Sequence, residues 1–374
     1  MNKIVIIGSS HHNTYSMIRC YGERGIRPDL ILYGNPDSYI LQSVYIGEIH
    51  VAKDATDAIL LLRKFYTDCL VIACSDEVAS FMDKSYEELI RYFYFFNCGS
   101  TGMLTYFMDK VVQSDVASQV GLKVPSSIDA KPDKIDPRNL SYPCIIKPLE
   151  SINGGKNIQI CRSETEVRTA LNSFDVESKV MIQQYVEKDF ELVVVGLSFN
   201  GDIHIPAFIH KHRETKGGTT YATVRPVSEL PTNVLSSCRR LVEKMSYQGL
   251  FGIELICKDE DFYFIEINLR NDATTYAIAI AGCNLPLAFW GLVNGQNASN
   301  IFAKPIRKIN SMVEFKDFVH VLKRHVSLLT WIKQRKGCEC KYCYSSLDKR
   351  PYRKQKQDFI KFLFKMIYTH GIVR

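Results

Sequence analysis

The first hundred residues alternate short apolar runs with stretches of helical periodicity, and this alternation constrains the fold more than any other feature. The apolar runs, which predict buried strands, lie at 3–7, 29–33 and 69–73, and the helical stretches lie between them at 14–24 and 56–66. Strands that alternate with helices form a mostly parallel sheet. We therefore predict an α/β domain at the start of the chain.

Polar residues follow two of these strands. Ser9 and His11 come after the first strand, and Asp76 and Glu77 come after the strand that ends at Ala73. Ligands of parallel sheets bind beyond the carboxyl ends of the strands, so these residues are candidates for a substrate pocket. The acidic pair has a structural alternative, because acidic residues favour the first turn of a helix. The turn that follows the first strand, at 8–13, lacks the second and third glycines of a dinucleotide fingerprint. The chain also has no phosphate-loop consensus.

Two glutamates lie among apolar residues in a predicted β-hairpin over residues 251–270. If Cys257 pairs with Tyr263, Glu254 lies directly across from Glu266. Glutamates are costly to bury among apolar residues unless a partner compensates their charge. The hairpin therefore indicates a functional site, and the alternative is a solvated face with two incidental glutamates.

Asn268 falls on the same face of this hairpin by strand alternation. Three hard oxygen donors on one face suit Mg²⁺, or Mn²⁺ in its place, which takes its other ligands from phosphates and water. We therefore predict a divalent metal site formed by Glu254, Glu266 and Asn268.

A lysine and a glycine-rich turn suggest a polyphosphate site further upstream. Lys147 ends a short apolar strand, and the segment at 151–157, which contains Ser151, Gly154 and Gly155, precedes another strand. Glycines let backbone N–H groups approach an anion, and the lysine supplies a positive charge. An ordinary hairpin turn with a surface lysine is the alternative.

Two further segments have binding potential. Extended backbone at 183–186 could meet an adenine edge, and Glu191 could accept hydrogen bonds from ribose hydroxyls. The basic cluster at 210–213 could meet a phosphate or a substrate carboxylate, or it could be a solvated loop. Zinc is disfavoured there, because no further His or Cys has suitable spacing nearby.

The order of these motifs resembles the ATP-grasp superfamily over roughly residues 1–295. The motifs that carry the resemblance are Lys110, 143–148, the glycine-rich turn, 183–186, Glu191, Glu254, and Glu266-x-Asn268-x-Arg270. Within the superfamily, the segments at 74–77 and 266–272 are most similar to carboxylate–amine ligases of the D-aspartate ligase and carbamoyl phosphate synthase-like group.

The resemblance implies a role for each matching residue. Nucleotide binding would involve Lys110, Lys147, Ser151, Gly154, Gly155, Gln183, Tyr185, Val186 and Glu191. Metal binding would involve Glu254, Glu266 and Asn268, and the catalytic residues would be Lys147 and Arg270, with Arg270 on the reacting carboxylate. Substrate contacts are expected from Ser9, His11, Asp76, Glu77, Lys211, Arg213 and Asn271.

The implied fold is an ATP-grasp fold preceded by a parallel-sheet α/β domain and followed by a basic helical extension. The expected divisions are 1–105, 106–190 with the glycine-rich lid, 191–300 with the metal and substrate site, and 301–374. The implied activity uses ATP to turn a small-molecule carboxylate into an acyl phosphate and joins it to an amine. The alternatives are a kinase or carboxylase variant and a catalytically silent nucleotide-binding assembly protein.

The sequence departs from the family pattern at several positions. Many relatives have proline at Leu269 and glycine at Ala273, and acidic residues often replace Gln183 and Gln184. These departures weaken the assignment to a ligase subgroup more than the assignment of a nucleotide site.

The C-terminal fifth is strongly basic. Residues 301–374 contain eighteen Lys or Arg against five Asp or Glu, whereas the remainder has twenty-nine against thirty-five. Apolar spacing predicts one amphipathic helix over 314–333 and another near 359–367. The second helix either packs on the body, which would bury Phe362 and Leu363 against residues before 300, or meets an anionic membrane surface or a lipid-linked substrate.

Other features bear on location and partners. The N-terminal apolar run is too short for a signal peptide, and no apolar stretch approaches the ~20 residues of a spanning helix. The twelve cysteines predict reduced core residues of a cytoplasmic protein, and the alternative in which the basic C-terminus meets a membrane would make that protein peripheral to the membrane. Cys338, Cys340 and Cys343 lack a matched fourth ligand, so zinc is unlikely. Nucleic acid is an unlikely partner, and an oligomer is possible.

Overall fold

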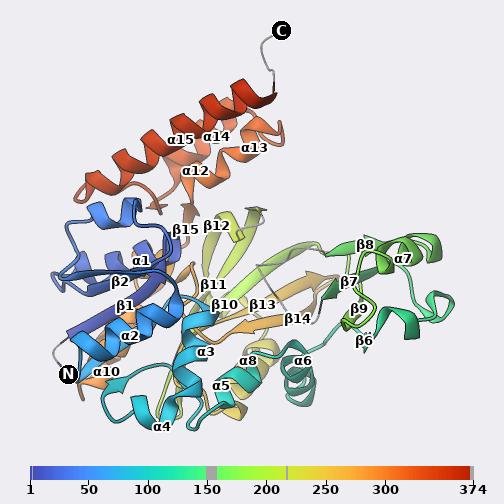
Figure 1. Ribbon diagram of the computed structural model, residues 1–374, viewed down its shortest axis with the longest axis horizontal. Coiled ribbons are helices and arrows are strands. Elements are labelled where there is room, and N and C mark those ends of the chain that lie inside the picture. The colour runs from blue at the N-terminus through green and yellow to red at the C-terminus, as the bar shows by residue number, and fades with distance from the viewer. Residues whose placement is uncertain (2, 149–157, 216–217, 371–374) are drawn as a thin grey trace.

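A computed structural model describes residues 1, 3–148, 158–215 and 218–370 (Figure 1). As predicted, a parallel-sheet α/β domain precedes two further sheets. The N-terminal sheet has the order β3-β2-β1-β4-β5 and is parallel throughout. Its elements are β1 (Lys3–Ser9), α1 (His12–Gly22), β2 (Asp29–Tyr33), η1 (Tyr39–Gln42), β3 (Ile49–Ala52), α2 (Ala55–Phe65), β4 (Cys69–Ala73), α3 (Asp76–Lys84), α4 (Tyr86–Leu89) and β5 (Phe93–Tyr94).

The topology of this sheet places a crevice at its centre. The chain leaves β1 for β2 on one side and later returns to β4 on the other side. Such a switch in direction opens a crevice beyond the carboxyl ends of the two central strands. Ser9 and Asp76 therefore lie beside the same opening.

A four-stranded antiparallel sheet with order β6-β9-β7-β8 forms a separate unit. Its elements are β6 (Ser127–Ala130), η2 (Pro132–Lys134), η3 (Pro137–Asn139), β7 (Cys144–Pro148), β8 (Gln159–Cys161), α7 (Glu164–Leu171) and β9 (Val180–Gln184). A small core around Ile146, Val167 and Ile182 holds it together. Figure 1 shows this unit standing away from the N-terminal domain.

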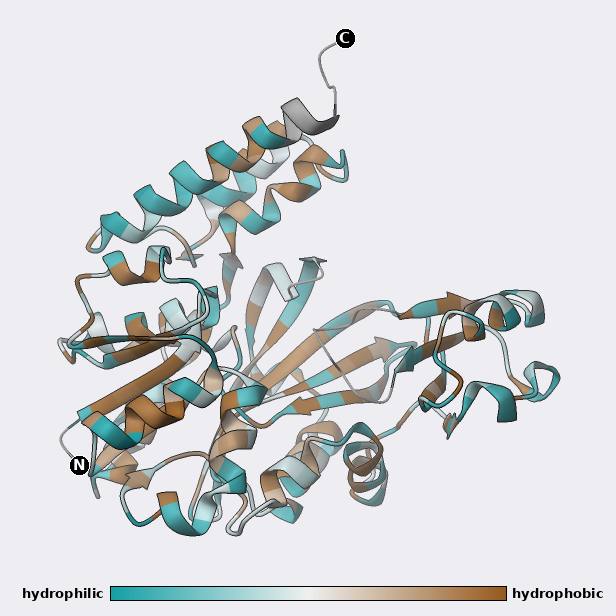
Figure 2. Cartoon of the chain, in the orientation of Figure 1, coloured by the Kyte–Doolittle hydropathy of each residue, from teal (hydrophilic) through white to brown (hydrophobic). Residues whose placement is uncertain are grey.

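The largest sheet has seven strands in the order β14-β13-β10-β11-β12-β15-β16. Its strands are β10 (Phe190–Phe199), β11 (Asp202–Thr215), β12 (Gly218–Pro226), β13 (Gly249–Lys258), β14 (Asp261–Asn268), β15 (Ile309–Met312) and β16 (Cys340–Lys341). The helices around it are α5 (Met103–Phe107), α6 (Lys110–Gln119), α8 (Thr232–Lys244), α9 (Thr275–Ala281), α10 (Leu285–Val293) and α11 (Ser299–Phe302), and η4 spans Val227–Glu229. One continuous hydrophobic core joins this sheet to the N-terminal domain, and Figure 2 shows the apolar residues concentrated in these strands.

The hairpin β13–β14 places its two glutamates opposite each other as predicted, although the strand pairing nearer its turn differs from the prediction. Glu254 lies opposite Glu266, but Cys257 pairs with Phe262 and not with Tyr263. A register shift between Glu254 and Leu255 accounts for the difference, because an extra residue on β14 restores the predicted pairing.

The predicted helix over 314–333 is broken into three helices. They are α12 (Glu314–Asp317), α13 (Val319–Leu322) and α14 (Leu328–Gly337), followed after β16 by α15 (Lys349–His370). Arg324 has a φ of 60°, which no helix accommodates, and the Ser327 side chain caps the start of α14. The prediction of one helix was therefore wrong.

The long helix α15 packs on the body along one side only. Phe359 contacts Phe315 and Phe318, and α15 also packs against η1 of the N-terminal domain. Phe362 nevertheless remains 48% exposed, so the burial that the packing alternative expected for this side chain is not found.

The cysteines and the apolar helices give two further findings. All twelve cysteines are buried free thiols, as predicted, and burial raises the pKa of Cys338 to about 12. Within the described ranges, no single helix is long and apolar enough to cross a membrane, although α9 and α10, bent by 94°, pass a length and composition test together.

Candidate active site

A cavity of about 1330 Å³ lies between the N-terminal domain, the large sheet and the small sheet. Several elements contribute predicted residues to its lining. These residues are Ser9, His11, Asp76, Lys110, Lys147, Lys211, Glu254, Glu266, Asn268 and Arg270. The folding of distant segments therefore brings ten of the predicted residues to one opening.

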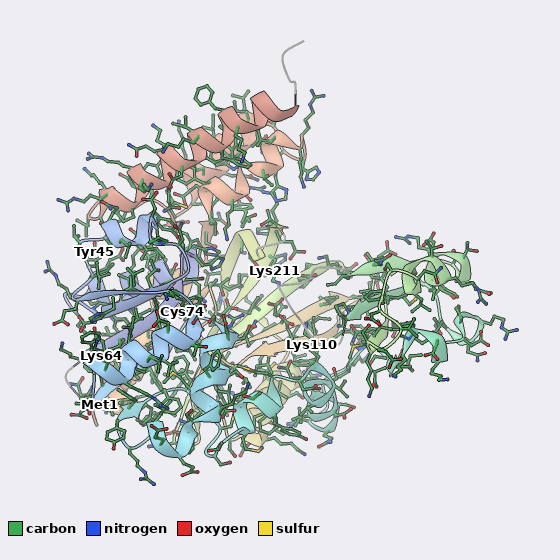
Figure 3. The ribbon with its side chains drawn as sticks, in the orientation of Figure 1. Met1, Tyr45, Lys64, Cys74, Lys110 and Lys211 are labelled. Atoms are coloured by element: carbon green, nitrogen blue, oxygen red, sulfur yellow. The ribbon has the colours of Figure 1, made fainter. Side chains whose placement is uncertain are left out.

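Lys211 on β11, labelled in Figure 3, lines the cavity and bridges two carboxylates. Its Nζ lies 2.6 Å from Oε2 of Glu254 and 3.3 Å from Oε2 of Glu191. Burial disfavours the lysine charge, but the two carboxylates outweigh it and raise the pKa of Lys211. Burial also raises the pKa of Glu254, while Lys211 opposes that effect. The cavity thus holds a buried ion cluster.

Two more lysines line the side of the cavity near the small sheet. Lys110 Nζ, at the start of α6, lies 3.3 Å from Oε2 of Glu266. Lys147 Nζ, on β7, donates to Oε1 of Gln183 at 3.0 Å. Burial, with a smaller contribution from Lys110, lowers the pKa of Lys147 to about 8. Lys147 is thus a desolvated cation with a neutral hydrogen-bond partner.

A chain of hydrogen bonds continues from the glutamates to the N-terminal domain. Asn268 Nδ2 donates to Oε1 of Glu254 at 3.4 Å, and its own Oδ1 accepts from Nη2 of Arg270 at 3.1 Å. Arg270 also donates from Nε and Nη2 to the two oxygens of Asp76, at 2.7 and 3.2 Å. Burial disfavours the guanidinium charge, but Asp76 outweighs it and raises the pKa of Arg270.

Asn13 fixes the crevice to the end of β14. Its Nδ2 donates to the carbonyls of Cys74 and Asn271, at 3.2 and 3.1 Å. The side chain is almost fully buried, so both bonds form in a low-dielectric setting that strengthens them. The crevice of the N-terminal domain and the metal face of the hairpin are thereby held in one arrangement.

The opposite end of the cavity contains three basic nitrogens. Lys316 Nζ, on α12, lies 2.8 Å from Nε2 of His11 and 3.3 Å from Nδ1 of His12, and both histidines line the cavity. Burial lowers the pKa of Lys316 and of His12. Among the described residues, no carboxylate forms an ion pair with the Lys316 ammonium.

The donor set at the centre of the cavity fits a hard divalent cation. Glu254, Glu266 and Asn268 present oxygen atoms on one hairpin face, and lysine ammonium groups now neutralise the two carboxylates. A cation such as Mg²⁺ prefers such oxygens and leaves room for phosphate ligands. No group of three His, Cys, Asp or Glu residues in the described part of the chain is placed to hold a metal, so the set here depends on the amide oxygen of Asn268 as its third donor.

The structure does not bring every predicted residue to the cavity. Arg213 is turned away, because its guanidinium donates to both oxygens of the buried Asp317, at 3.0 and 2.7 Å. Glu77 is exposed beside the opening, and Asn271 is buried behind it. These three residues do not line the cavity in this structure.

The predicted adenosine residues lie beside the lining. Gln183 contacts Lys147, and Glu191 contacts Lys211. The backbone N–H of Tyr185 donates to Pro143, and Val186 is buried. Ser151, Gly154 and Gly155 lie outside the described residues.

Sequence reasoning missed Asn13, His12 and Lys316. His12 is adjacent to a predicted residue, so its position beside a strand end was the available signal. Lys316 and His11 are 305 residues apart in the chain, and no local sequence pattern predicts a contact between them.

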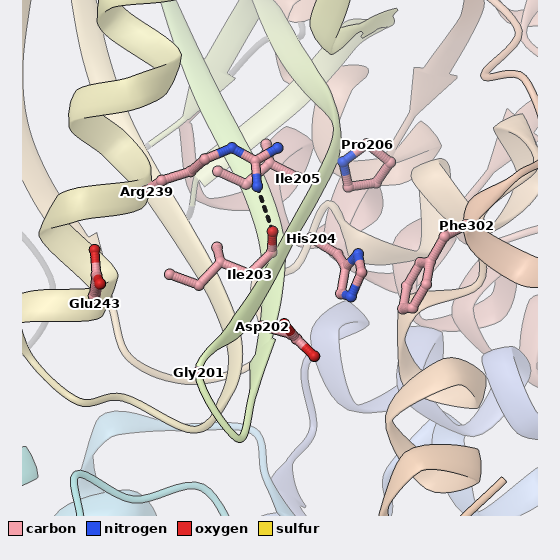
Figure 4. Close-up of a pocket in the computed structure, with 9 residues that line it drawn as sticks. All are labelled: Gly201, Asp202, Ile203, His204, Ile205, Pro206, Arg239, Glu243 and Phe302. Atoms are coloured by element: carbon pink, nitrogen blue, oxygen red, sulfur yellow. Dashed lines mark hydrogen bonds between the residues drawn. The ribbon is translucent and has the colours of Figure 1, made fainter. Parts of the chain in front are cut away.

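A second cavity of about 480 Å³ lies at the turn between β10 and β11 (Figure 4). His204 stacks on Phe302 with ring centroids 3.8 Å apart, and Arg239 donates to the backbone carbonyl of Ile203. None of the residues that line it was predicted to have a function.

Comparison with known families and proteins supports the ATP-grasp resemblance. The ATP-grasp domain family matches residues 115–286. The formate-dependent phosphoribosylglycinamide formyltransferase of Maridesulfovibrio salexigens is 26% identical over 175 residues, which cover 44% of each protein. The match thus spans less than half the length of this curated relative.

Solved structures share the fold at low identity. N5-carboxyaminoimidazole synthetase from Staphylococcus aureus, complexed with ADP, superposes with a TM-score of 0.67 at 14% identity, covering 87% of this chain and 86% of that one. L-amino acid ligase from Bacillus licheniformis superposes with a TM-score of 0.62 at 16% identity, covering 83% and 80%. At these identities the likeness concerns the fold.

Proposed function

We propose that this chain, in which the ATP-grasp domain family matches residues 115–286, is an ATP-dependent ligase that activates a carboxylate as an acyl phosphate and joins it to an amine. One observation carries the proposal: Lys110, Lys147, Glu254, Glu266 and Arg270 line the same cavity. A carboxylate is a poor electrophile until it is phosphorylated. Phosphoryl transfer itself needs positioning and charge neutralisation more than covalent help.

The lysines would hold the nucleotide phosphates. Lys110 and Lys147 lie at the small-sheet side of the cavity, and residues 151–157, which are not described, would close over them to exclude water. Adenine would contact Gln183, Tyr185 and Val186, and ribose would contact Glu191.

Glu254, Glu266 and Asn268 would hold Mg²⁺. When bound, Mg²⁺ neutralises charge on the phosphate oxygens. The present partners of the glutamates are lysines, so Lys110 and Lys211 would be released toward phosphate or substrate oxygens.

Arg270 would hold the reacting carboxylate. Asp76 fixes its guanidinium plane through two hydrogen bonds, and Asn268 links it to the metal face. A planar fork held in this way suits a carboxylate or an acyl phosphate. The reacting group would thereby lie between the metal face and the N-terminal crevice.

The far end of the cavity would hold an anionic group on one of the two substrates. Lys316, His11 and His12 cluster there, and burial disfavours an uncompensated ammonium at such a place. A substrate carboxylate or phosphate would supply the missing counter-charge. The substrates expected are therefore small acids and amines of which at least one carries a second anion.

The relatives support the carboxylate as first substrate. One relative is a formate-dependent formyltransferase, and one structural neighbour is an L-amino acid ligase. The kinase or carboxylase variant and the silent assembly protein remain the competing functions. The predicted cytoplasmic location also remains a proposal.

The experiment is a screen of amino acids and small acids for ADP release by the purified protein. We expect release that requires both an acid and an amine, and release of phosphate in equal amount. ADP formation that needs only one substrate would favour the kinase variant, and a requirement for bicarbonate would favour the carboxylase variant. Nucleotide binding without turnover for any pair would favour the silent protein.

A further inference from the structure

The end of the C-terminal helices farthest from the N-terminal domain exposes large apolar side chains. Figure 1 shows α13 and the later half of α15 side by side there. We call this region the distal surface. Its apolar members are Leu322 (39% exposed), Leu328 (49%), Leu329 (80%), Ile360 (41%), Phe362 (48%) and Phe364 (59%).

The packing of α15 on the rest of the protein does not depend on these exposed side chains. Tyr352 and Phe359 stack on Phe315 and already form the contact with α12. Lys354 further ties the first half of the helix to Asp37 of the N-terminal domain at 2.7 Å. Ile360, Phe362 and Phe364 therefore belong to a helix whose position is fixed without them.

The same surface is strongly cationic, because most of the local acids are buried. Of the five acidic residues beyond residue 300, Glu314, Asp317 and Asp348 are at most 1% exposed. All three accept hydrogen bonds inside the protein. The exposed Lys and Arg side chains therefore meet little negative charge. Those on the distal surface are Lys323 and Arg324, whereas Lys361 interacts electrostatically with Asp37 of the N-terminal domain.

We propose that the distal surface docks on an anionic lipid bilayer. Helices that interleave exposed leucine and phenylalanine with lysine lie in the membrane interface, where the apolar groups insert and the cations meet lipid phosphates and carboxylates. The proposal concerns a region outside the cavity and does not depend on the function proposed for it.

Other occupants fit this surface less well. A second copy of the chain would bring like charges together, which opposes association. A nucleic acid would satisfy the cations but would leave side chains such as Leu329 in water. A bilayer satisfies both features, so the chemistry of the surface favours it.

The test is co-sedimentation of the full-length protein with large vesicles at low and physiological salt. Vesicles of phosphatidylcholine alone are compared with vesicles that also contain phosphatidylserine. We expect pelleting with the anionic vesicles, weakened by salt. A protein that stays in the supernatant with both vesicles, or that pellets equally with both, would overturn the proposal.

Matched variants locate the surface. Replacement of Lys323 and Arg324 by Gln should weaken binding about 25-fold, because each basic residue near an anionic surface is worth about a fivefold change in affinity. The control replaces Lys53 and Lys64, both exposed on the N-terminal domain, by Gln and should bind like the wild type. Equal loss in both double variants would show that binding is not at the distal surface.

An apolar pair completes the design. Phe364→Ser should weaken binding several-fold, whereas Leu60→Ser, which is equally exposed on α2, should not. Unchanged melting temperatures establish that each variant is folded. A gel shift with a short RNA in place of vesicle binding would assign the surface to nucleic acid and overturn the proposal.

Discussion

Two groups of acidic side chains in this protein are withdrawn from bulk water, and they are satisfied in different ways. In the C-terminal extension, Asp317 is fully buried and accepts hydrogen bonds from Arg213, Thr220 and Trp331. In the cavity, Glu266 is partly exposed and contacts the ammonium of Lys110 at 3.3 Å. A fixed network of several donors stabilises a fold, whereas a single lysine can exchange its carboxylate for another partner. The number and kind of partners that compensate the charge of each carboxylate therefore separate structural acids from functional ones.

The largest expected effect is on turnover. Glu266→Gln and Lys147→Ala should each lower the rate of ATP turnover by about 10³-fold or more, because each removes charge that positions and neutralises the transferring phosphate. The melting temperature should change little, since both side chains face the cavity. ADP release under saturating ATP measures the first quantity, and thermal unfolding measures the second. Near-normal turnover in either folded variant would remove that residue from the machinery.

The reverse result is expected at Asp317. Asp317→Ala leaves Arg213 buried without its carboxylate, and breaking such a pair costs about 3–5 kcal/mol of unfolding free energy. Guanidinium denaturation measures this loss, with Asp133→Ala as the exposed control. If Glu266→Gln destabilised the protein as much as Asp317→Ala, the distinction between structural and functional acids would fail.

Particular strands and residues show which features of this protein can be predicted from its sequence. Strands at 29–33 and 69–73 were predicted to the residue, because each is a short apolar run bounded by polar residues. The pairing of Glu254 with Glu266 was predicted from strand alternation, but the bulge that produces it was not, since a bulge depends on both strands at once.

Long-range contacts account for the predictions that failed. The helix expected over 314–333 is interrupted at Phe318 and again after Leu322. Glu314 and Asp317 in its first turn accept hydrogen bonds from Cys343 and Thr220, which are distant in the chain. Arg213 was expected near substrate for its charge, but its partner lies 104 residues away in the chain. Local sequence patterns reflect secondary-structure propensity, and they carry no information about partners that are distant in the chain.

A smaller effect should separate the two steps of the reaction. Arg270→Ala should leave ATP affinity within about twofold of the wild type, because Arg270 lies beyond the metal face from Lys110 and Lys147. Acid-dependent ADP release should fall by about 10²-fold, since the variant lacks a charged donor for the reacting carboxylate. Nucleotide titration and ADP release measure the two quantities on the same sample. A loss of ATP affinity as large as that of Lys147→Ala would place Arg270 at the nucleotide.

The smallest expected effect is a pH dependence that contrasts two lysines of the same cavity. Burial and Lys110 lower the pKa of Lys147 to about 8, whereas Glu254 and Glu191 outweigh burial at Lys211 and raise its pKa. In the nucleotide-free protein, Lys147 therefore loses its proton as pH rises through about 8, and Lys211 keeps its proton there. ATP affinity should fall by up to about tenfold per pH unit above that value, because the protonated form that binds phosphate becomes the minor form.

The contribution of Lys147 to the stability of the protein should follow the opposite sign over the same range. Between about pH 8 and the ordinary lysine pKa of 10.5, the unfolded chain holds a proton at position 147 that the folded chain has lost, so this residue makes stability rise with pH. Lys147→Arg keeps its charge throughout and should abolish the fall in ATP affinity, as measured by ATP titration. The free energy of unfolding of the wild type relative to this variant should rise across pH 7 to about 10, as measured by denaturation. Conservative replacement of Lys211 by Arg should leave both trends in place. If Lys147→Arg retained the wild-type pH dependence, another group would control phosphate binding, and the contrast between the unpaired and the paired lysine would lose its functional meaning.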